Sequence, residues 1–250
     1  MKFSHIGLLS AMPEEIGTIT NDLTDIKITS FGDFKVYSGI WKKDEDQFIY
    51  LSVAFSGWGK VSAARATTRL ISILYKNIPV ELILFTGVAA STKENIKQWD
   101  IVLGECLIQH DMDATPLFDK FVIPSLNKKE LLPPKKIFEF LFGKFKEFDS
   151  FFEQSKFGMV KRGVIASGDQ FVSDENTLKK ILLNIPTLSA IEMEGASFAQ
   201  VSIQENIPWL VIRVISDNAK EGSENDFSKF VQEYKFHSHK LISILIESFI

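Results

Sequence analysis

The sequence has few of the residues that mark several large classes of protein. A single cysteine, Cys106, among 250 residues excludes an internal disulfide framework and any zinc site built from several cysteines. There are 28 basic and 32 acidic residues, a formal net charge of −4, and neither half of the chain is basic, so a nucleic-acid-binding surface is not expected. No apolar run reaches the roughly 18 residues needed to span a bilayer, and the opening MKFSH segment does not resemble a signal peptide. We expect a soluble cytoplasmic protein that binds neither nucleic acid nor membranes.

Short apolar runs alternate with longer segments of helical periodicity. Runs such as 82–85 and 210–212 are apolar throughout, which is typical of strands covered by helices on both faces. The predicted strands are 5–10, 47–55, 80–86, 101–109, 163–167, 189–192 and 209–216. The predicted helices are 13–23, 60–76, 134–157, 174–183, 195–205 and 227–248. This alternation predicts an α/β fold, and because no repeat or Gly/Ser linker divides the chain, we expect one domain over residues 1–250.

The segment 134–157 is rich in phenylalanine. Rings at helical spacing are typical of core packing, although so much ring surface could also close a subunit interface. The residues concerned are Phe138, Phe140, Phe142, Phe145, Phe148, Phe151, Phe152 and Phe157.

Acidic side chains follow the first predicted strand, at the place where sites form in α/β sheets. Glu14 and Glu15 fall in the first turn of the helix predicted to open at Pro13. They could serve the helix dipole alone, or one of them could hold a water molecule at the mouth of the sheet.

A second pair of carboxylates, Glu192 and Glu194, ends the predicted strand 189–192. In strand geometry both point to the same side, and two like charges there cost energy unless something binds between them or one of them lies beyond the sheet. Arg213, which interrupts an apolar strand, needs a carboxylate nearby in turn. The same strand ends in Ser216 and Asp217, and a polar loop follows, so these two are candidate site residues as well as candidate helix caps.

Other motifs are less specific. The glycine-containing turns predicted at 56–60 and 86–90 would let a ligand approach the backbone, but they match neither a dinucleotide-binding fingerprint nor a phosphate-binding loop. The HDMD sequence at 110–113 matches no zinc pattern, so no metal site is predicted. Cys106 lies within an apolar strand and is expected to fill space in the core.

Six segments, taken in chain order, resemble the nucleoside phosphorylase/nucleosidase family: AMPEEI (11–16), SGWGK (56–60), TGVAAS (86–91), SGDQFV (167–172), IEMEGAS (191–197) and VIRVISD (211–217). The match covers nearly the whole chain, and within the family it favours the 5′-methylthioadenosine/S-adenosylhomocysteine nucleosidases of bacteria and plants. The resemblance implies a single-domain, three-layer α/β/α sandwich with a mixed, partly barrel-like central sheet. It also implies a homodimer that hydrolyses the N-glycosidic bond of 5′-thio-substituted adenosines without a metal or organic cofactor.

The resemblance assigns roles to particular residues. Glu15 matches the carboxylate that activates the attacking water, and Glu194 matches the ligand of the ribose hydroxyls. Asp217, oriented by Ser216, matches the acid that delivers a proton toward adenine N7. Phe171 would stack on adenine, whose edge is read by the backbone of Val172. The remaining implied contacts are Met12, Trp58, Ala89, Met193 and Phe227, with Ala114, Leu117 and Pro124 reaching the 5′ pocket of a partner subunit.

These residue types suit the implied chemistry. Departure of a nucleobase leaves an oxocarbenium-like sugar, which nearby negative charge stabilises. Adenine leaves readily only when protonated, so an acid with a raised pKa is needed, and a second carboxylate must hold the water on the opposite face of the sugar.

The chain departs from the family pattern at several positions. Trp58 stands where a smaller aliphatic residue is common, which leaves the preferred 5′ group open. Val88 and Ala90 replace a serine and a glycine often found in that turn. Phe85 stands where the phosphorylase branch typically carries an arginine, and Arg is the preferred residue for a phosphate dianion, so hydrolysis is favoured over phosphorolysis.

Three alternatives remain open at this point. The first is a phosphate-dependent purine nucleoside phosphorylase, which Phe85 and the acidic 14–15 pair oppose. The second is an aminofutalosine hydrolase, which would differ from a nucleosidase for 5′-thio-substituted adenosines in the 5′ pocket alone. The third is a non-catalytic nucleoside-binding protein of the same fold, which the presence of Glu15, Glu194 and Asp217 opposes.

Overall fold

A computed structural model describes residues 1–148 and 155–250. Among these residues, one mixed sheet contains nine strands: β1 (His5–Ser10), β2 (Thr24–Phe31), β3 (Phe34–Lys42), β4 (Phe48–Phe55), β7 (Leu82–Ser91), β8 (Ile101–Gln109), β9 (Val160–Ser167), β10 (Leu188–Glu192) and β11 (Trp209–Asp217). Two further short strands, β5 (Leu74–Tyr75) and β6 (Ile78–Pro79), pair with each other. The helices are α1 (Lys60–Ile71), α2 (Lys135–Glu147), α4 (Glu175–Asn184), α5 (Gly195–Gln204), α6 (Ser223–Tyr234) and α7 (Ser238–Glu247), with 3₁₀ turns η1 (Pro13–Glu15) and η2 (Ile19–Asp22).

The strand order is β10-β9-β8-β11-β7-β1-β4-β3-β2, and an additional antiparallel pairing joins β10 to β7. That pairing closes β7, β11, β8, β9 and β10 into a five-stranded barrel, while β1, β4, β3 and β2 extend from β7 as an open sheet. The mixed, partly barrel-like sheet expected from the resemblance is therefore confirmed.

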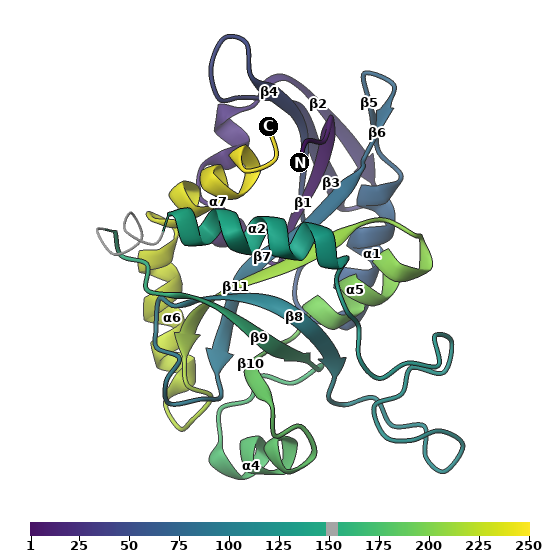
Figure 1. Cartoon of the computed structure of the whole chain (residues 1–250), viewed down its shortest axis with the longest axis vertical. Helices are drawn as coiled ribbons and strands as arrows, with labels where there is room; N and C mark the ends of the chain where they lie inside the picture. The colour runs from purple at the N-terminus through teal and green to yellow at the C-terminus, as the bar shows by residue number, and fades with distance from the viewer. Residues whose placement is uncertain (149–154) are drawn as a thin grey trace.

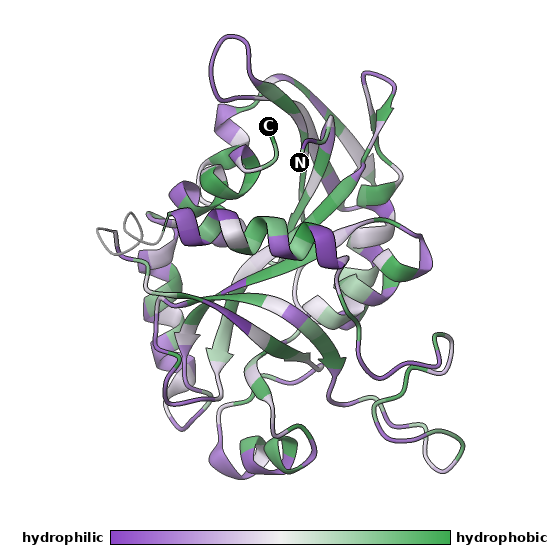
Figure 2. Cartoon of the chain, in the orientation of Figure 1, coloured by the Kyte–Doolittle hydropathy of each residue, from purple (hydrophilic) through white to green (hydrophobic). Residues whose placement is uncertain are grey.

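Side chains of the central strands alternate between two apolar cores. In β7, Leu82 and Leu84 join the core that α2, α6 and α7 cover, whereas Ile83 and Phe85 join the core under α1 and α5. Figure 1 shows α2 crossing the front of the sheet, with α6 and α7 along one side and α1 and α5 along the other. In Figure 2 the strands between them are largely hydrophobic, while α2 alternates hydrophobic and hydrophilic residues along its length. This is the predicted α/β/α layering.

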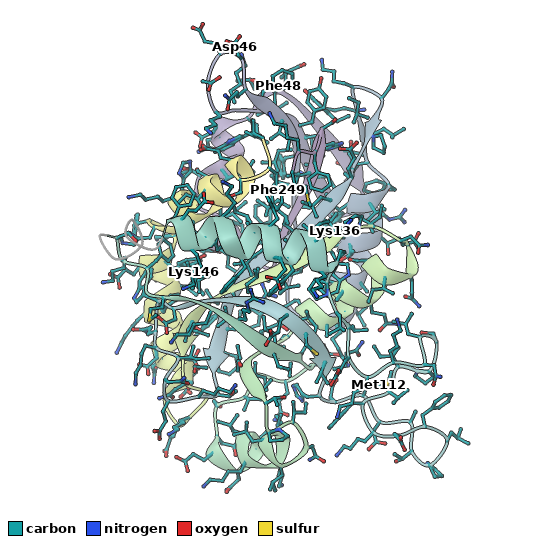
Figure 3. All side chains as sticks on the ribbon, viewed as in Figure 1. Asp46, Phe48, Met112, Lys136, Lys146 and Phe249 are labelled. Carbon is teal, nitrogen blue, oxygen red and sulfur yellow. The ribbon has the colours of Figure 1, made fainter. Side chains whose placement is uncertain are left out.

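The phenylalanines of 134–157 are mostly core residues. Phe138 and Phe145 on α2 are buried, Phe140 and Phe142 pack against the same core, and Phe157 is buried beyond the helix. Figure 3 shows Lys136 and Lys146 near opposite ends of α2, which ends at Glu147 and not at the predicted 157. Phe151 and Phe152 lie outside the described residues, and Phe148 is partly exposed.

Several predicted boundaries are wrong. The predicted helix 13–23 is replaced by the turns η1 and η2, because Gly17 between them has a φ of +59° and its backbone lies against α7. Helix 227–248 is two helices, α6 and α7, and helix 60–76 ends at Ile71 before β5 and β6. The predicted turn at 86–90 is a continuation of β7, which pairs there with β11 and β10. Strands β2 and β3 were not predicted.

Among the described residues, no helix is long and apolar enough to cross a membrane.

Candidate active site

A cavity of about 540 Å³ lies where β1, β7, β10 and β11 end. It brings together all eleven of the substrate-side residues predicted from the sequence: Met12, Glu15, Trp58, Ala89, Phe171, Val172, Met193, Glu194, Ser216, Asp217 and Phe227. No lysine, arginine or histidine is among the described residues that line it. The interior is therefore acidic and aromatic, with no cation exposed to a bound ligand.

Glu15 is held in the cavity by four hydrogen bonds. One carboxylate oxygen, Oε2, accepts from the Ser10 hydroxyl at 2.6 Å and from the backbone N–H groups of Ala11 at 2.9 Å and Met12 at 3.1 Å. The other, Oε1, accepts from the Val88 N–H at 3.0 Å. Burial raises the pKa of Glu15 above its ordinary value, although Arg213 and these hydrogen bonds oppose that rise. Glu14 on the same turn does not line the cavity, so the two glutamates are not equivalent.

Glu192 and Glu194 have Arg213 between them. Arg213 Nη2 forms an ion pair with Glu192, Nε donates to Glu192 Oε2 at 3.1 Å, and Glu194 Oε2 is 3.8 Å from Nη2. The Arg213 side chain is 1% exposed and its guanidinium lies over the Phe85 ring, 4.4 Å from the centroid. The expectation that Arg213 has a carboxylate partner is confirmed. Of the two alternatives for the glutamate pair, both occur: Arg213 lies between the carboxylates, and Glu194 lies beyond the end of β10.

Phe85 itself is fully buried and does not line the cavity. It lies beneath Arg213, in contact with Phe198 of α5. The position at which an arginine would face phosphate in a phosphorylase is therefore apolar and covered in this chain.

Glu194 differs from Glu192 in how many of its carboxylate lone pairs are already used by hydrogen bonds within the protein. Strand β10 ends at Glu192, whose oxygens are occupied by Arg213, Ser167 and the N–H groups of Glu194 and Gly195. Glu194 begins α5, and its Oε1 accepts a 2.8 Å hydrogen bond from the Gly59 N–H. Burial and the neighbouring Glu192 carboxylate raise the pKa of Glu194, against the effect of Arg213. Glu194 is thus the member of the pair that lacks a full set of protein partners.

Asp217 is positioned by an irregularity in β11. The register between β11 and β7 shifts between Ile215 and Asp217, and such bulges re-aim side chains at the ends of strands. Asp217 Oδ2 accepts from the Ser216 hydroxyl at 2.7 Å, and Oδ1 accepts from the Ala219 N–H at 2.9 Å. Burial raises the pKa of Asp217 above its ordinary value, against these two hydrogen bonds. The polar loop predicted after Asp217 extends to Gly222, where α6 begins earlier than expected.

Three aromatic side chains from distant parts of the chain meet along one wall. The Phe227 ring is edge-to-face with Trp58 at 5.8 Å and with Phe171 at 5.7 Å between centroids. Trp58 is 50% exposed and Phe171 is 36% exposed, so both present ring surface that a ligand could cover.

The predicted partner-directed residues do not line this cavity. Ala114, Leu117 and Pro124 lie on the long connection after β8, and Leu117 is 85% exposed. Figure 3 labels Met112 at the start of this connection, just beyond the end of β8.

The sequence reasoning did not single out Ala11, Gln170 and Ile191 as lining residues. All three belong to the segments that carried the resemblance. Taking every residue of those segments as a candidate lining residue would have identified them. Within residues 1–148 and 155–250, no three His, Cys, Asp or Glu side chains form a group that could hold a metal ion. Cys106 is buried and unpaired, as predicted.

Comparison with known proteins defines the class. A family model described as the phosphorylase superfamily matches residues 5–247, and the chain belongs to this superfamily. A 5′-methylthioadenosine/S-adenosylhomocysteine nucleosidase of Staphylococcus aureus strain JH9 is 30% identical over 247 residues, which cover 96% of this chain and 98% of the relative. The resemblance drawn from the sequence motifs is confirmed.

Two solved structures extend the comparison. A 5′-methylthioadenosine/S-adenosylhomocysteine nucleosidase from Neisseria meningitidis, in complex with methylthio-immucillin-A, is 27% identical with a TM-score of 0.84, covering 98% of this chain and 100% of the other. A futalosine hydrolase of Helicobacter pylori strain 26695 is 31% identical with a TM-score of 0.81, covering 98% and 97% respectively.

Proposed function

We propose that residues 1–250 form a single nucleosidase domain that hydrolyses the N-glycosidic bond of 5′-thio-substituted adenosines, with methylthioadenosine and S-adenosylhomocysteine as the substrates. The products are adenine and a free thioribose. The observation that carries the proposal is the cavity itself, which gathers four buried carboxylates, one of them (Glu192) paired with Arg213, and an aromatic wall but presents no cationic side chain among its described lining residues. Such a lining suits a cationic sugar transition state and does not suit a phosphate dianion.

In the proposed reaction, Glu15 accepts a proton from water as the water oxygen bonds to C1′ of the ribose. The bond from C1′ to adenine N9 breaks, and its electron pair leaves with the base. Asp217 gives its proton to adenine N7, which makes the base a better leaving group. The raised pKa of Asp217 supports this role, because a carboxyl group donates a proton only while it is protonated.

Glu194 is assigned to the ribose hydroxyls because its Oε2 accepts no hydrogen bond from the described residues. The ion-pair partner of this oxygen, Arg213 Nη2, is 3.8 Å away. In its ionised form, Glu194 also stabilises the positive charge that develops on the sugar. Met193 and Met12 provide apolar surface beside the sugar, and Phe171 provides a ring face for adenine, with the Val172 backbone at its edge. The 5′ group is assigned to the side of the cavity where Trp58 and Phe227 meet.

We also propose that the protein works as a homodimer in the cytoplasm, with Ala114, Leu117 and Pro124 closing the 5′ pocket of the partner subunit. The support is the long connection after β8, which carries Leu117 at 85% exposure and Phe118 at 36%. Apolar side chains presented in this way favour burial against another chain.

A second candidate function is hydrolysis of aminofutalosine, for which the likeness to the Helicobacter pylori futalosine hydrolase is the specific observation. The two reactions share the base, the ribose and the three carboxylates. They differ in the 5′ group, which meets Trp58.

The deciding experiment is a substrate panel that follows release of free base by absorbance. Methylthioadenosine, S-adenosylhomocysteine, 5′-deoxyadenosine, aminofutalosine, adenosine and inosine are compared with and without phosphate. We expect adenine release from the two thio-substituted compounds without phosphate. Preference for aminofutalosine would favour the second candidate, and no release from any compound would favour a nucleoside-binding protein.

A further inference from the structure

Two loops that line the cavity and the connection after β8 are joined by a closed ring of hydrogen bonds. The ring contains Lys60 at the start of α1, Asp111 after β8 and Asp169 after β9. Lys60 Nζ donates to Asp111 Oδ1 at 2.6 Å, the Asp169 N–H donates to Asp111 Oδ2 at 2.9 Å, and the Lys60 N–H donates to Asp169 Oδ1 at 2.7 Å. None of the three residues lines the cavity.

Each member of the ring is close in sequence to a residue that does line the cavity or that is assigned to the subunit interface. Lys60 is two residues after Trp58, and Asp169 is two residues before Phe171. Asp111 opens the connection that carries Leu117, and Figure 3 shows its neighbour Met112 where that connection leaves the sheet. The ring therefore fixes the relative positions of the two aromatic loops and anchors the connection to both.

The Trp58 loop also has backbone hydrogen bonds of its own, from the Ser56 and Gly57 N–H groups to the carbonyls of Ser10 and Ala11 at 2.8 and 3.1 Å, but these two bonds do not reach the Phe171 loop. Gly57 and Gly59, on either side of Trp58, have φ values of +76° and +91°, so this loop has a backbone conformation that glycine alone adopts easily. Gly59 at the N-cap of α1 has no side chain to accept the first N–H groups of the helix, and the Asp169 carboxylate takes that place. The Gly59 N–H donates to Glu194, so the loop that the ring holds also contacts the carboxylate assigned to ribose.

The ring is partly shielded from water, which strengthens its hydrogen bonds. The side chains of Lys60 and Asp111 are 19% and 31% exposed, and Lys60 Nζ is also 3.3 Å from Gln109 Oε1, which extends the contact toward α5 through Gln200. Burial would raise the pKa of Asp111, but the hydrogen bonds from Lys60 and the Asp169 N–H lower it below its ordinary value. The carboxylate form is thus the one that the ring stabilises.

We propose that Lys60, Asp111 and Asp169 are positioning residues, which set the spacing between the Trp58 loop and the Phe171 loop and so set the affinity for the nucleoside. This proposal rests on the proposed function for its kinetic consequence, although the arrangement of the loops can be measured without any substrate. The reacting groups Glu15 and Asp217 have their own hydrogen bonds, so the ring acts on binding more than on the chemical step.

The chemistry of Asp111 provides a sharp test. Asp111 uses both carboxylate oxygens as acceptors, whereas Asp169 is recorded accepting through Oδ1 alone. Asparagine has one acceptor oxygen and one donor NH₂, so Asp111→Asn must place a donor against either Lys60 Nζ or the Asp169 N–H. Asp169→Asn can keep its single bond to the Lys60 N–H. The two isosteric changes are therefore expected to have different effects.

The experiment measures kcat and KM for methylthioadenosine together with acrylamide quenching of tryptophan fluorescence in ligand-free protein. Trp58 is 50% exposed, whereas Trp41, Trp99 and Trp209 are each 8% exposed or less, so quenching reports on the Trp58 loop. For Asp111→Asn we expect KM to rise about tenfold, the effect of losing one charge-assisted hydrogen bond, with kcat within about twofold and stronger quenching. Asp169→Asn can keep its one hydrogen bond, so its effects on KM and quenching should be clearly smaller than those of Asp111→Asn.

A matched control is Asp25→Asn, which removes another Lys–Asp contact, with Lys76, between side chains that are 55% and 50% exposed and do not line the cavity. It should change neither KM nor quenching.

Unchanged KM and quenching in Asp111→Asn would overturn the proposal, as would an Asp169→Asn variant that is impaired equally. If Asp111→Asn does not fold, Lys60→Met is measured in its place. Unaltered tryptophan quenching in that variant would contradict the proposed role of the ring. If the unaltered protein releases no adenine, the proposed function fails while the quenching series still tests the ring.

Discussion

Gly87 and Arg213 are direct cross-strand partners in β7 and β11, and the guanidinium of Arg213 occupies the space that a side chain at position 87 would need. A Cβ atom built on Gly87 would lie 2.6 Å from Arg213 Nη1 and 2.6 Å from Glu15 Oε1. The absence of a side chain at this position lets the Glu15 carboxylate and the buried cation Arg213 approach the same stretch of backbone.

Gly87→Ala should therefore disturb both Glu15 and Arg213, because neither can shift without losing hydrogen bonds. We expect a loss of stability of about 1–3 kcal/mol, as for an overpacked core, and a loss of most activity. Gly143→Ala is the control, since a Cβ there meets nothing within 4 Å and the residue lies inside α2. It should raise the free energy of unfolding by about 0.5–1 kcal/mol with unchanged turnover. Thermal unfolding and adenine release measure both; a fully active Gly87→Ala protein would contradict this account.

The two adjacent glutamates of η1 should differ sharply in function. Glu15→Gln keeps the size of the side chain but cannot accept the proton of the attacking water, so turnover should fall by a factor of about 10² or more. Glu14→Gln should change the free energy of unfolding by a few tenths of a kcal/mol, with little effect on rate. Turnover and melting temperature of both variants test this. If the Glu14 variant is the inactive one, the assignment is displaced by one residue.

Asp217 should set the alkaline limit of activity. Its pKa is raised, so the protonated form that donates to adenine persists above the pH at which an ordinary aspartate is ionised, and activity is lost as pH rises through that value. Asp217→Asn keeps the shape but removes the proton, and turnover should fall about 10²-fold with a smaller effect on binding. A pH profile of kcat for the unaltered protein and turnover of the variant provide the measurement. Near-normal turnover in the variant would rule out leaving-group protonation by Asp217.

Turnover should not require phosphate. Phe85 is buried beneath Arg213, whose guanidinium is occupied by Glu192, so neither provides a dianion site. The rate should be the same with and without phosphate in the buffer, and the sugar product should carry no phosphate. A rate that rises in proportion to phosphate, with a ribose 1-phosphate product, would reverse the choice of reaction.

The proposed dimer can be tested with two leucines of similar exposure. Leu117 is 85% exposed on the connection after β8, and Leu183 is 83% exposed on α4. Burying a leucine contributes about 1.5–3 kcal/mol, and a two-fold symmetric interface would bury it twice. Leu117→Asp should therefore weaken dimerisation and lower activity, while Leu183→Asp should do neither. Light scattering at assay concentration gives the mass. A monomeric unaltered protein with full activity would eliminate the dimer.

The strands at the centre of the sheet were predictable because burial on both faces makes them continuously apolar. The predicted limits of β1 and β8 agree with the structure, and β11 differs by one residue at its end. The pairing of Arg213 with a carboxylate was also predictable, because an arginine in an apolar strand has few ways to be stable.

The elements that escaped prediction lack that pattern. β2 exposes most of its side chains, including Ile26 at 51% and Ile28 at 55%, and its sequence has no continuous apolar run. The break between α6 and α7 falls at 235–237, where neither glycine nor proline is present. The Lys60–Asp111–Asp169 ring was hidden for a different reason, since it joins residues 51 and 109 positions apart that meet only after the barrel closes.

Strand β7 is shared by both parts of the sheet, since it pairs with β1 in the open part and with β11 and β10 in the barrel. The two edges of β7 therefore carry hydrogen bonds of both substructures. Opening this one strand would separate Gly87 from Arg213, release the Val88 N–H from Glu15 and break the barrel, so β7 ties the integrity of the cavity to that of the folded core.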